Sequence, residues 1–302
     1  MPYQTGTATS PADLQTKIAA FATANGWTAN GAPVKSYSQA GCYFALSVDG
    51  SGRLVINGGN GADGTGALTG VCAQGGAIYL PSAAWPATYH LFAHTAPVSL
   101  WCVVNYSGDY YQWLAAGNIT TYGTYTGGNW FGGWTKSVTG TLTPCMSQLY
   151  GGYTGASGYG SVAPFMSPYV NGAYQVSSAF VHCELDGALW PGDASGINYP
   201  TFSLQASPLW ARGPNVWNAQ TVLLPWILWL SRVGGYTSPI GHIAHLRAAR
   251  IDNYTPGDII TLGPDRWKIF PWWRKDTANP LGNIGTGGTT GTLAFVLRYD
   301  GP

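Results

Sequence analysis

One imidazole and two carboxylates alternate along the segment VHCELDG, and these are the side chains of the chain best suited to chemistry. If the segment is a β-strand, its period of two places His182, Glu184 and Asp186 on one face. Two carboxylates this close together can bind a cation, or flank a glycosidic bond as acid and base. The same alternation is typical of a solvated strand face. We prefer that interpretation and expect no catalytic residue.

Other motifs that carry chemistry are incomplete. Residues 59–64 match GxGxxG, but no helical pattern follows them, so we expect a glycine hairpin loop and not a nucleotide site. His90 and His94 are four residues apart, and His242 and His245 are three apart. Such spacings bring ligands together on a helix but not on a strand, and His90 lies in an expected strand. We predict structural histidines, no metal ion and no cofactor.

Aromatic side chains offer a second kind of site, because they stack on sugar rings and fill protein interfaces. They gather in the Gly/Tyr/Trp-rich residues 121–160 and again in residues 266–275. We expect packing and protein contact, with sugar binding as the alternative, and we expect a chain without residues 125–160 to fold but to lose its contacts. The candidate contact residues are Trp130, Phe131, Trp134, Tyr150, Tyr153, Tyr159, Trp272, Trp273 and Arg274.

The composition points to a surface covered by other chains. Charged residues make up 8% of the 302 residues, against about 25% in ordinary soluble domains. The chain has 43 glycines, 19 tyrosines and 14 tryptophans, and 45% of its residues are hydrophobic, which is enough for a sizeable core. The formal net charge of +1 argues against a nucleic-acid groove. We therefore expect an assembly subunit, in a homo-oligomer, before an enzyme.

Cysteines and apolar runs bear on where the chain folds. The first residues contain neither a basic region nor an apolar run of the kind found in signal peptides. The apolar run 222–230 is interrupted by Pro225 and falls short of the ~20 residues of a membrane span. We expect folding in a cytoplasm, no membrane span and buried free thiols, with one or two disulfides as the alternative. The five cysteines are Cys42, Cys72, Cys102, Cys145 and Cys183.

A single helix is predicted near the start of the chain. Ser10 is a suitable N-cap, Pro11 suits the first helical position, and Asp13 follows three residues after the cap. Apolar residues recur at helical spacing from Leu14 to Ala22, and Asn25-Gly26 is a typical stop signal. We expect the following tryptophan to pack back onto the apolar face of this helix.

The remainder of the chain reads as β-structure. Hairpins are predicted over residues 42–59 and 98–119, whose turns contain glycine. Residues 220–232 and 242–252 are ambiguous between strand and helix. The expected fold is mainly β, an antiparallel sandwich or barrel-like architecture with a short N-terminal helix and long Gly/aromatic-rich loops. A shift toward basic residues suggests a division into residues 1–165 and 166–302, although a single domain remains open. Further strands are expected at residues 75–81, 88–94, 257–263, 266–273 and 292–302.

Three blocks of the sequence resemble virion structural proteins of tailed bacteriophages. The first is MPYQTGTATSPADLQTKIAAFATANGWT, a polar leader followed by a helix that closes on an NGW turn. The second is the hairpin VSLWCVVNYSGDYYQWLAAGNI, and the third is the ending PDRWKIFPWWRKDTANPLGNIGTGGTTGTLAFVLRYDGP. These blocks cover about a third of the chain. They are patterns and not catalytic signatures, so the resemblance assigns no functional residue.

The resemblance implies a structural subunit of a tail, baseplate or neck, located in the virion after folding in the host cytoplasm. Its partners would be other virion proteins and copies of itself, with no nucleic acid. Three alternatives stay open at this point. They are a carbohydrate-binding receptor module at the tail tip that recognises a host surface glycan, a capsid decoration protein, and a polysaccharide-degrading enzyme that uses Glu184 and Asp186.

Overall fold

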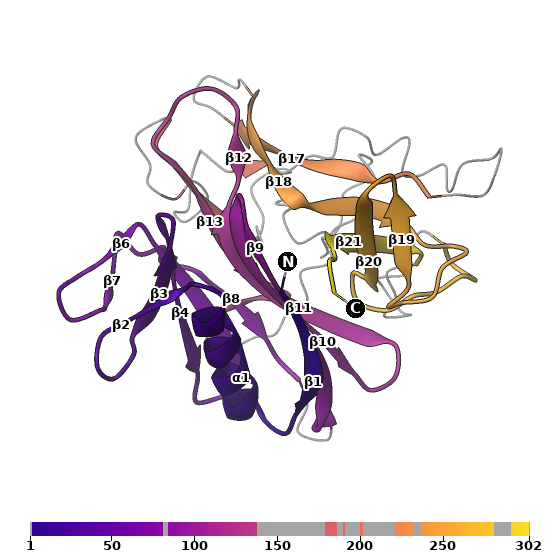
Figure 1. Cartoon of the computed structure of the whole chain (residues 1–302), viewed down its shortest axis with the longest axis horizontal. Coiled ribbons are helices and arrows are strands. Elements are labelled where there is room, and N and C mark those ends of the chain that lie inside the picture. The colour runs from indigo at the N-terminus through magenta and orange to yellow at the C-terminus, as the bar shows by residue number, and fades with distance from the viewer. Residues whose placement is uncertain are drawn as a thin grey trace, which may run out of the picture.

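The described part of the chain is mainly antiparallel β-structure with one helix (Figure 1). The computed structural model describes residues 2–80, 84–137, 179–185, 190, 200–201, 221–231, 237–280 and 291–301. Strands in these ranges form two six-stranded sheets, one seven-stranded sheet and a two-stranded hairpin. The prediction of a mainly β protein with an N-terminal helix is confirmed.

Helix α1 (Pro11–Ala24) begins at the predicted cap. The Asp13 backbone N–H donates to Ser10 Oγ at 3.1 Å, and the Asp13 carboxylate accepts from the Thr9 backbone N–H at 2.8 Å. These contacts satisfy backbone donors that the first helical turn leaves free. Trp27 lies beyond the end of the helix, only 2% exposed, in the same core as the buried face of α1. Both expectations for this segment are confirmed.

Six strands form a sheet in the middle of the molecule, called here the central sheet (Figure 1). Its order is β1-β9-β10-β11-β13-β15, and all pairs are antiparallel. The β10–β11 hairpin confirms the prediction for residues 98–119, with Ser107 and Gly108 both at positive φ in the turn. The bounds are β1 (Tyr3–Ala8), β9 (Ala87–Thr95), β10 (Val98–Tyr106), β11 (Tyr110–Asn118), β13 (Gly127–Gly133) and β15 (Ala179–Cys183).

Residues near the N-terminus form a second six-stranded sheet, called the N-terminal sheet, in the order β14-β8-β5-β4-β3-β2. The predicted hairpin of residues 42–59 is its β4–β5 pair. Residues 59–64, which match GxGxxG, lead into the small β6–β7 hairpin, where Asp63 accepts turn N–H groups as a structural residue. The bounds are β2 (Thr28–Asn30), β3 (Ser36–Gln39), β4 (Cys42–Val48), β5 (Leu54–Gly59), β6 (Gly61–Ala62), β7 (Leu68–Thr69), β8 (Gly75–Ile78) and β14 (Thr135–Ser137).

The third sheet, called the C-terminal sheet, has the order β16-β17-β18-β21-β20-β19, and β12 also pairs with β18. The two segments that were ambiguous between strand and helix, residues 220–232 and 242–252, contribute to β17 and β18 of this sheet. These two strands pair along most of their length. The strands expected over residues 257–263, 266–273 and 292–302 are β19, β20 and β21. The bounds are β12 (Thr120–Thr121), β16 (Pro200–Thr201), β17 (Leu224–Ser231), β18 (Thr237–Arg250), β19 (Ile259–Leu262), β20 (Asp265–Pro271) and β21 (Leu293–Arg298).

Both faces of the central sheet are buried. Along β10, Leu100 and Cys102 pack toward α1 and the N-terminal sheet, whereas Trp101 and Val103 pack toward the C-terminal sheet. An antiparallel sheet more often has one face in water, which gives alternating polar and apolar residues. Burial on both sides explains why β10 and β11 read as nearly continuous apolar runs. The central sheet therefore forms the middle layer between two cores.

Residues 121–160 are not one long loop. Residues 127–137 form β13 and β14, and β13 lies between β11 and β15 in the central sheet. We therefore replace the expectation that a chain without residues 125–160 folds by the opposite prediction, because the deletion removes an inner strand. Residues 138–160 lie outside the described part of the chain.

Strand pairing crosses the suggested division at residue 165. β15, from the second part, pairs with β13 of the first part in the central sheet. β12, from the first part, pairs with β18 of the second part in the C-terminal sheet. The division itself stays a prediction. Four cysteines, at positions 42, 72, 102 and 183, are buried thiols as predicted, and Cys145 lies outside the described residues. Within the described residues, no helix has the length and apolar character needed to cross a membrane.

Candidate functional site

A partly exposed group of rings and one guanidinium lies where the β10–β11 hairpin meets the segment after β20. The two segments are joined by an antiparallel bridge between Tyr110 and Arg274, and the Tyr111 backbone N–H donates to Trp273 O at 2.8 Å. Residues from three parts of the sequence thereby come together. We call this group the aromatic cluster, and it consists of Tyr106, Tyr110, Trp134, Trp273 and Arg274.

The side chains of the aromatic cluster are held by direct contacts. Arg274 lies over the Tyr110 ring, with its guanidinium carbon 5.2 Å from the ring centroid, and its Nη1 donates to Tyr110 Oη at 3.2 Å. Trp273 Nε1 donates to Tyr106 Oη at 3.0 Å. The Tyr110 and Trp273 rings are 5.2 Å apart at 60°, and the Trp134 and Trp273 rings are 5.8 Å apart. These contacts fix the orientation of the outer rings before any ligand arrives.

The cluster has a buried floor and a partly exposed rim. Tyr106 and Trp134 are each 9% exposed, and burial raises the pKa of the Tyr106 hydroxyl, which favours its neutral, donating form. Tyr110, Trp273 and Arg274 keep part of their surface in solvent. Flat rings beside a cationic donor suit stacking against a sugar or a neighbouring chain.

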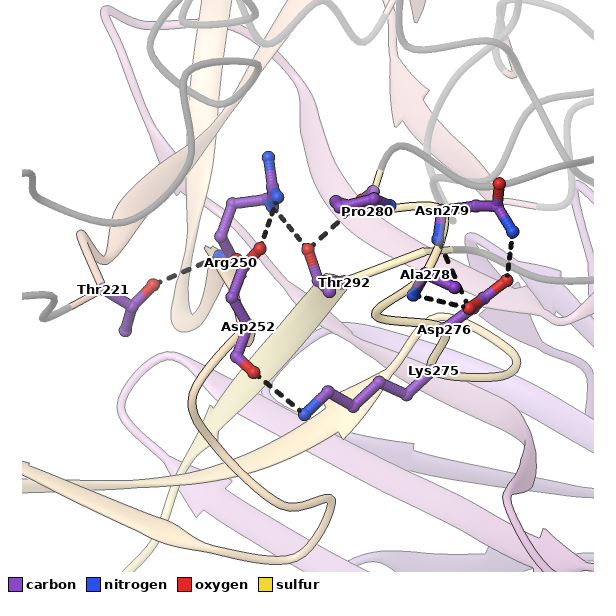
Figure 2. A network of polar contacts seen from close by, with 9 residues as sticks. All are labelled: Thr221, Arg250, Asp252, Lys275, Asp276, Ala278, Asn279, Pro280 and Thr292. Atoms are coloured by element: carbon purple, nitrogen blue, oxygen red, sulfur yellow. Dashed lines mark hydrogen bonds and ion pairs between the residues drawn. The ribbon is translucent and has the colours of Figure 1, made fainter.

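A buried polar network supports the segment that carries Trp273 and Arg274 (Figure 2). Arg250 at the end of β18 donates from Nε to Thr292 Oγ1 and from Nη2 to Asp252 Oδ1, both at 2.7 Å. Lys275 donates from Nζ to Asp252 O at 3.2 Å and to Tyr254 O at 2.6 Å. The residue next to Arg274 is thus tied to the C-terminal sheet, which keeps the rim of the aromatic cluster in place.

Three residues of the cluster were predictable from the sequence as contact candidates, and two were not. Trp134, Trp273 and Arg274 were candidates and lie together. Tyr106 and Tyr110 were not, although they flank the predicted Ser-Gly-Asp turn and close its hairpin as a strand pair. That position at a hairpin end was the only signal available.

Three other candidates lie in the interior. Trp130, Phe131 and Trp272 are each 1–2% exposed. Trp130 and Trp272 belong to the core between the central and C-terminal sheets, and Phe131 belongs to the core on the opposite face. This is a correction to their candidacy as contact residues, because rings covered by the chain itself cannot contact another molecule. Tyr150, Tyr153 and Tyr159 lie outside the described residues.

The polar trio of the VHCELDG segment is present in part. His182 is 4% exposed on β15, and its Nε2 lies 3.0 Å from Glu184 Oε1. On its other side, His182 Nδ1 lies 2.9 Å from Asn129 Oδ1. Glu184 is partly exposed, and Asp186 lies outside the described residues. The structure therefore gives one carboxylate an imidazole partner and says nothing of a carboxylate pair.

Hydrogen bonding indicates where the hydrogen of the neutral His182 ring lies. Asn129 Nδ2 donates to Gly59 O at 2.9 Å, so its Oδ1 faces His182, and His182 Nδ1 must carry a hydrogen. The contact between His182 Nε2 and Glu184 Oε1 becomes an ion pair when a second proton binds to the imidazole. Burial lowers the pKa of His182, and Glu184 opposes that shift. Trp190 covers the imidazole, with ring centroids 5.4 Å apart. The arrangement is that of a buried structural histidine whose ring is held by Asn129 and Glu184.

The described residues contain no candidate metal site. No group of three or more His, Cys, Asp or Glu side chains in these ranges could hold a metal ion. His90 and His94 lie on β9, and His242 and His245 lie on β18. Both pairs are therefore on strands, where their spacings do not bring the members of a pair together.

Comparison with known proteins assigns the chain to no family. No protein-family model matches the chain, and no curated protein matches it.

Proposed function

We propose that the protein is a structural subunit of a tailed-bacteriophage particle, in the tail, baseplate or neck, and that it acts through contacts with its own copies and with other virion proteins. The sequence resemblance at both ends and in the β10–β11 hairpin supports this role. We also propose that its layers form an antiparallel sandwich and not a barrel. The observation that carries the proposal is how the chain uses its few charges.

Most charged side chains in the described ranges are engaged within the chain. Ion pairs join Lys17 to Asp13, Arg53 to Asp49, Arg250 to Asp252 and Arg298 to Asp265. Other cations donate to backbone carbonyl oxygens, and they are Arg247, Arg266, Lys268 and Lys275. Because charged residues make up only 8% of the chain, we infer that its surface is mostly neutral.

A neutral surface suits permanent contact with other chains. Burying an unpaired charge costs much more than burying a neutral group that finds a hydrogen bond. Net charge also keeps copies apart, and the chain has a formal net charge of only +1. Exposed apolar side chains on the edge strand β19, Ile259 at 38% and Leu262 at 60%, lie beside the segment 266–275 that the sequence singled out for contact.

The first test measures assembly directly. Sedimentation of the purified chain over a wide concentration range should show concentration-dependent association, and labelled electron microscopy should locate the chain in phage particles. Leu262→Lys places a charge on the β19 edge and should reduce both association and incorporation, whereas Leu262→Gln, polar but neutral, should reduce them less. A chain that stays monomeric at every concentration and is absent from particles would overturn the proposal.

A second candidate function is glycan binding by the aromatic cluster, favoured by the partly exposed rim of Tyr110, Trp273 and Arg274. On an array of bacterial surface glycans, the chain should bind, Trp273→Ala should abolish binding, and Tyr122→Ala should retain it. Tyr122 is a suitable control because it is 41% exposed and lies beside His242, outside the cluster. No observation on the described residues favours a polysaccharide-degrading enzyme or a capsid decoration protein.

A further inference from the structure

Histidines gather at the contact between the central sheet and the C-terminal sheet. His94 on β9 and His245 on β18 are 1% and 6% exposed, and their rings stack with centroids 4.1 Å apart at 8°. His90 lies on the same strand as His94, and its ring is 5.3 Å from that of Phe270 on β20. We call His90, His94 and His245 the histidine joint.

Hydrogen bonds indicate that the stacked pair is neutral. His94 Nε2 lies 3.2 Å from Arg298 O, to which it can only donate, and in the neutral ring its Nδ1, 2.9 Å from Ser99 Oγ, accepts from that hydroxyl. His245 Nε2 donates to Pro97 O at 3.2 Å. Nδ1 of His245 is buried and makes no hydrogen bond to the described residues. An added proton must therefore go to an Nδ1 atom, and at His245 that atom is buried without a formed hydrogen bond.

The surroundings of the joint oppose protonation. Burial is the main cause that lowers the pKa of His94 to about 3 and of His90 to about 4, and it also lowers the pKa of His245. Nearby cations act in the same direction. Among the described residues, the charged and titratable groups around the joint are Arg247 and His242 on β18, Asp265 and Lys268 on β20, Arg298 on β21, Tyr3 on β1, and Tyr299.

Asp265 is the one carboxylate in this group, and it does not stabilise a protonated histidine in the joint. Asp265 is already ion-paired with Arg298. The other side of the central sheet differs, because His182 there has the Glu184 carboxylate beside it, which favours the protonated imidazole. A fall in pH therefore weakens the contact between the central and C-terminal sheets more than the contact between the central and N-terminal sheets.

We propose that the histidine joint is a proton-sensitive contact, at which acidification separates the C-terminal sheet from the central sheet while the N-terminal sheet stays packed. Neutral histidine holds the joint closed above about pH 6.5, the pKa of a solvated imidazole. Below that pH the opened form binds protons that the closed form excludes, so closure weakens until the pH reaches the lowered pKa values. Each histidine raises the open fraction by up to about tenfold per pH unit.

Hydrogen exchange followed by mass spectrometry tests this inference on the isolated chain, whether or not it assembles into particles. Between about pH 7 and pH 5, and after correction for intrinsic exchange, peptides from β17, β18, β20 and β21 should lose protection. Peptides from β4 and β5 should keep theirs. Equal loss in both sheets, or no loss in either, would overturn the proposal.

His245→Phe tests the residue itself. Phenylalanine keeps a flat ring against His94 but has no nitrogen to protonate, so the variant should lose less protection at acid pH than the original chain, by up to about tenfold per pH unit. His242→Phe is the matched control on the same strand, outside the stacked pair, and should change acid sensitivity less. If the two variants behave alike, the joint is not the sensor.

A measurement on the unaltered chain covers the case in which His245→Phe does not fold. Imidazole resonances should show His94 neutral down to the pH at which the C-terminal sheet loses protection. Titration of His94 near pH 6.5 in a protein whose exchange protection is unchanged would contradict the proposal.

Discussion

Phe131 illustrates how one side chain fixes the residues around it. Its ring packs against Phe180 and Trp190, with centroids 5.2 and 5.4 Å away. The same ring occupies the space that a Cβ atom on Gly58 would need. Glycine at position 58 is therefore required by the packing of an aromatic residue on another sheet, and not by its own backbone angles.

For a single residue, the structure predicts that truncating Phe131 greatly lowers the free energy of unfolding. Phe131→Ala leaves a cavity between the central and N-terminal sheets and should lower the free energy of unfolding by about 3–5 kcal/mol. Leu262→Ala, at a position 60% exposed, should change it by less than about 0.5 kcal/mol. Chemical denaturation of both variants measures the difference. Equal and small effects would mean that Phe131 is not a core residue.

Among the elements, the step from β13 to β14 carries the chain from the central sheet into the N-terminal sheet. Trp134 stands at this step, and its backbone N–H donates to Trp113 O at 2.8 Å. β14 then pairs with β8, which brings Gly76 and Gly133 backbone to backbone. Neither glycine has a positive φ angle, so lack of a side chain is what this crossing needs.

The crossing should not tolerate a methyl group. A Cβ atom at position 76 would collide with backbone atoms of Gly132 and Gly133, so Gly76→Ala should lower the free energy of unfolding by at least about 2 kcal/mol. Gly50→Ala is the control, because a Cβ there meets nothing within 4 Å and can even stabilise the fold by about 0.4–1 kcal/mol. Thermal unfolding of both variants gives the comparison, and a Gly76→Ala protein as stable as the control would contradict the crossing.

For the molecule as a whole, the middle position of the central sheet is the dominant feature. One core holds the sheet to α1 and the N-terminal sheet, and the other holds it to the C-terminal sheet. Removal of either outer layer therefore exposes a broad apolar face. The C-terminal sheet is also tied to the central sheet along the chain, because β12 follows β11 directly and pairs with β18.

A fragment of residues 1–165 tests this interdependence. It lacks β15 and the C-terminal sheet, and its exposed face would include Trp101, Trp113 and Trp130. We expect the fragment to aggregate or to bind a hydrophobic dye, and co-expression with residues 166–302 to restore a cooperatively unfolding protein. A monomeric fragment with well-dispersed amide resonances would instead support the division at residue 165.

Three of the five residues of the aromatic cluster followed from residue types, and the other two did not. Trp273 and Arg274 stand next to each other in the sequence, so a ring beside a cation was visible there. Their contact with Tyr110 joins residues 164 positions apart, and no local pattern encodes such a pairing. For the same reason, the sequence showed His94 only as a neighbour of His90, and His245 only as a neighbour of His242. It gave no sign that His94 and His245 stack on each other.

The sequence by itself determined the local elements: the cap at Ser10, the turns of the 42–59 and 98–119 hairpins, and the large share of β-structure. Neighbouring residues decide these features, through side-chain hydrogen bonds and backbone angles that need no distant partner. Only the tertiary structure decided that the aromatic residues of β13 face inward. Alternation along a strand says which residues share a face, but whether water or another sheet covers that face depends on segments far away in the chain.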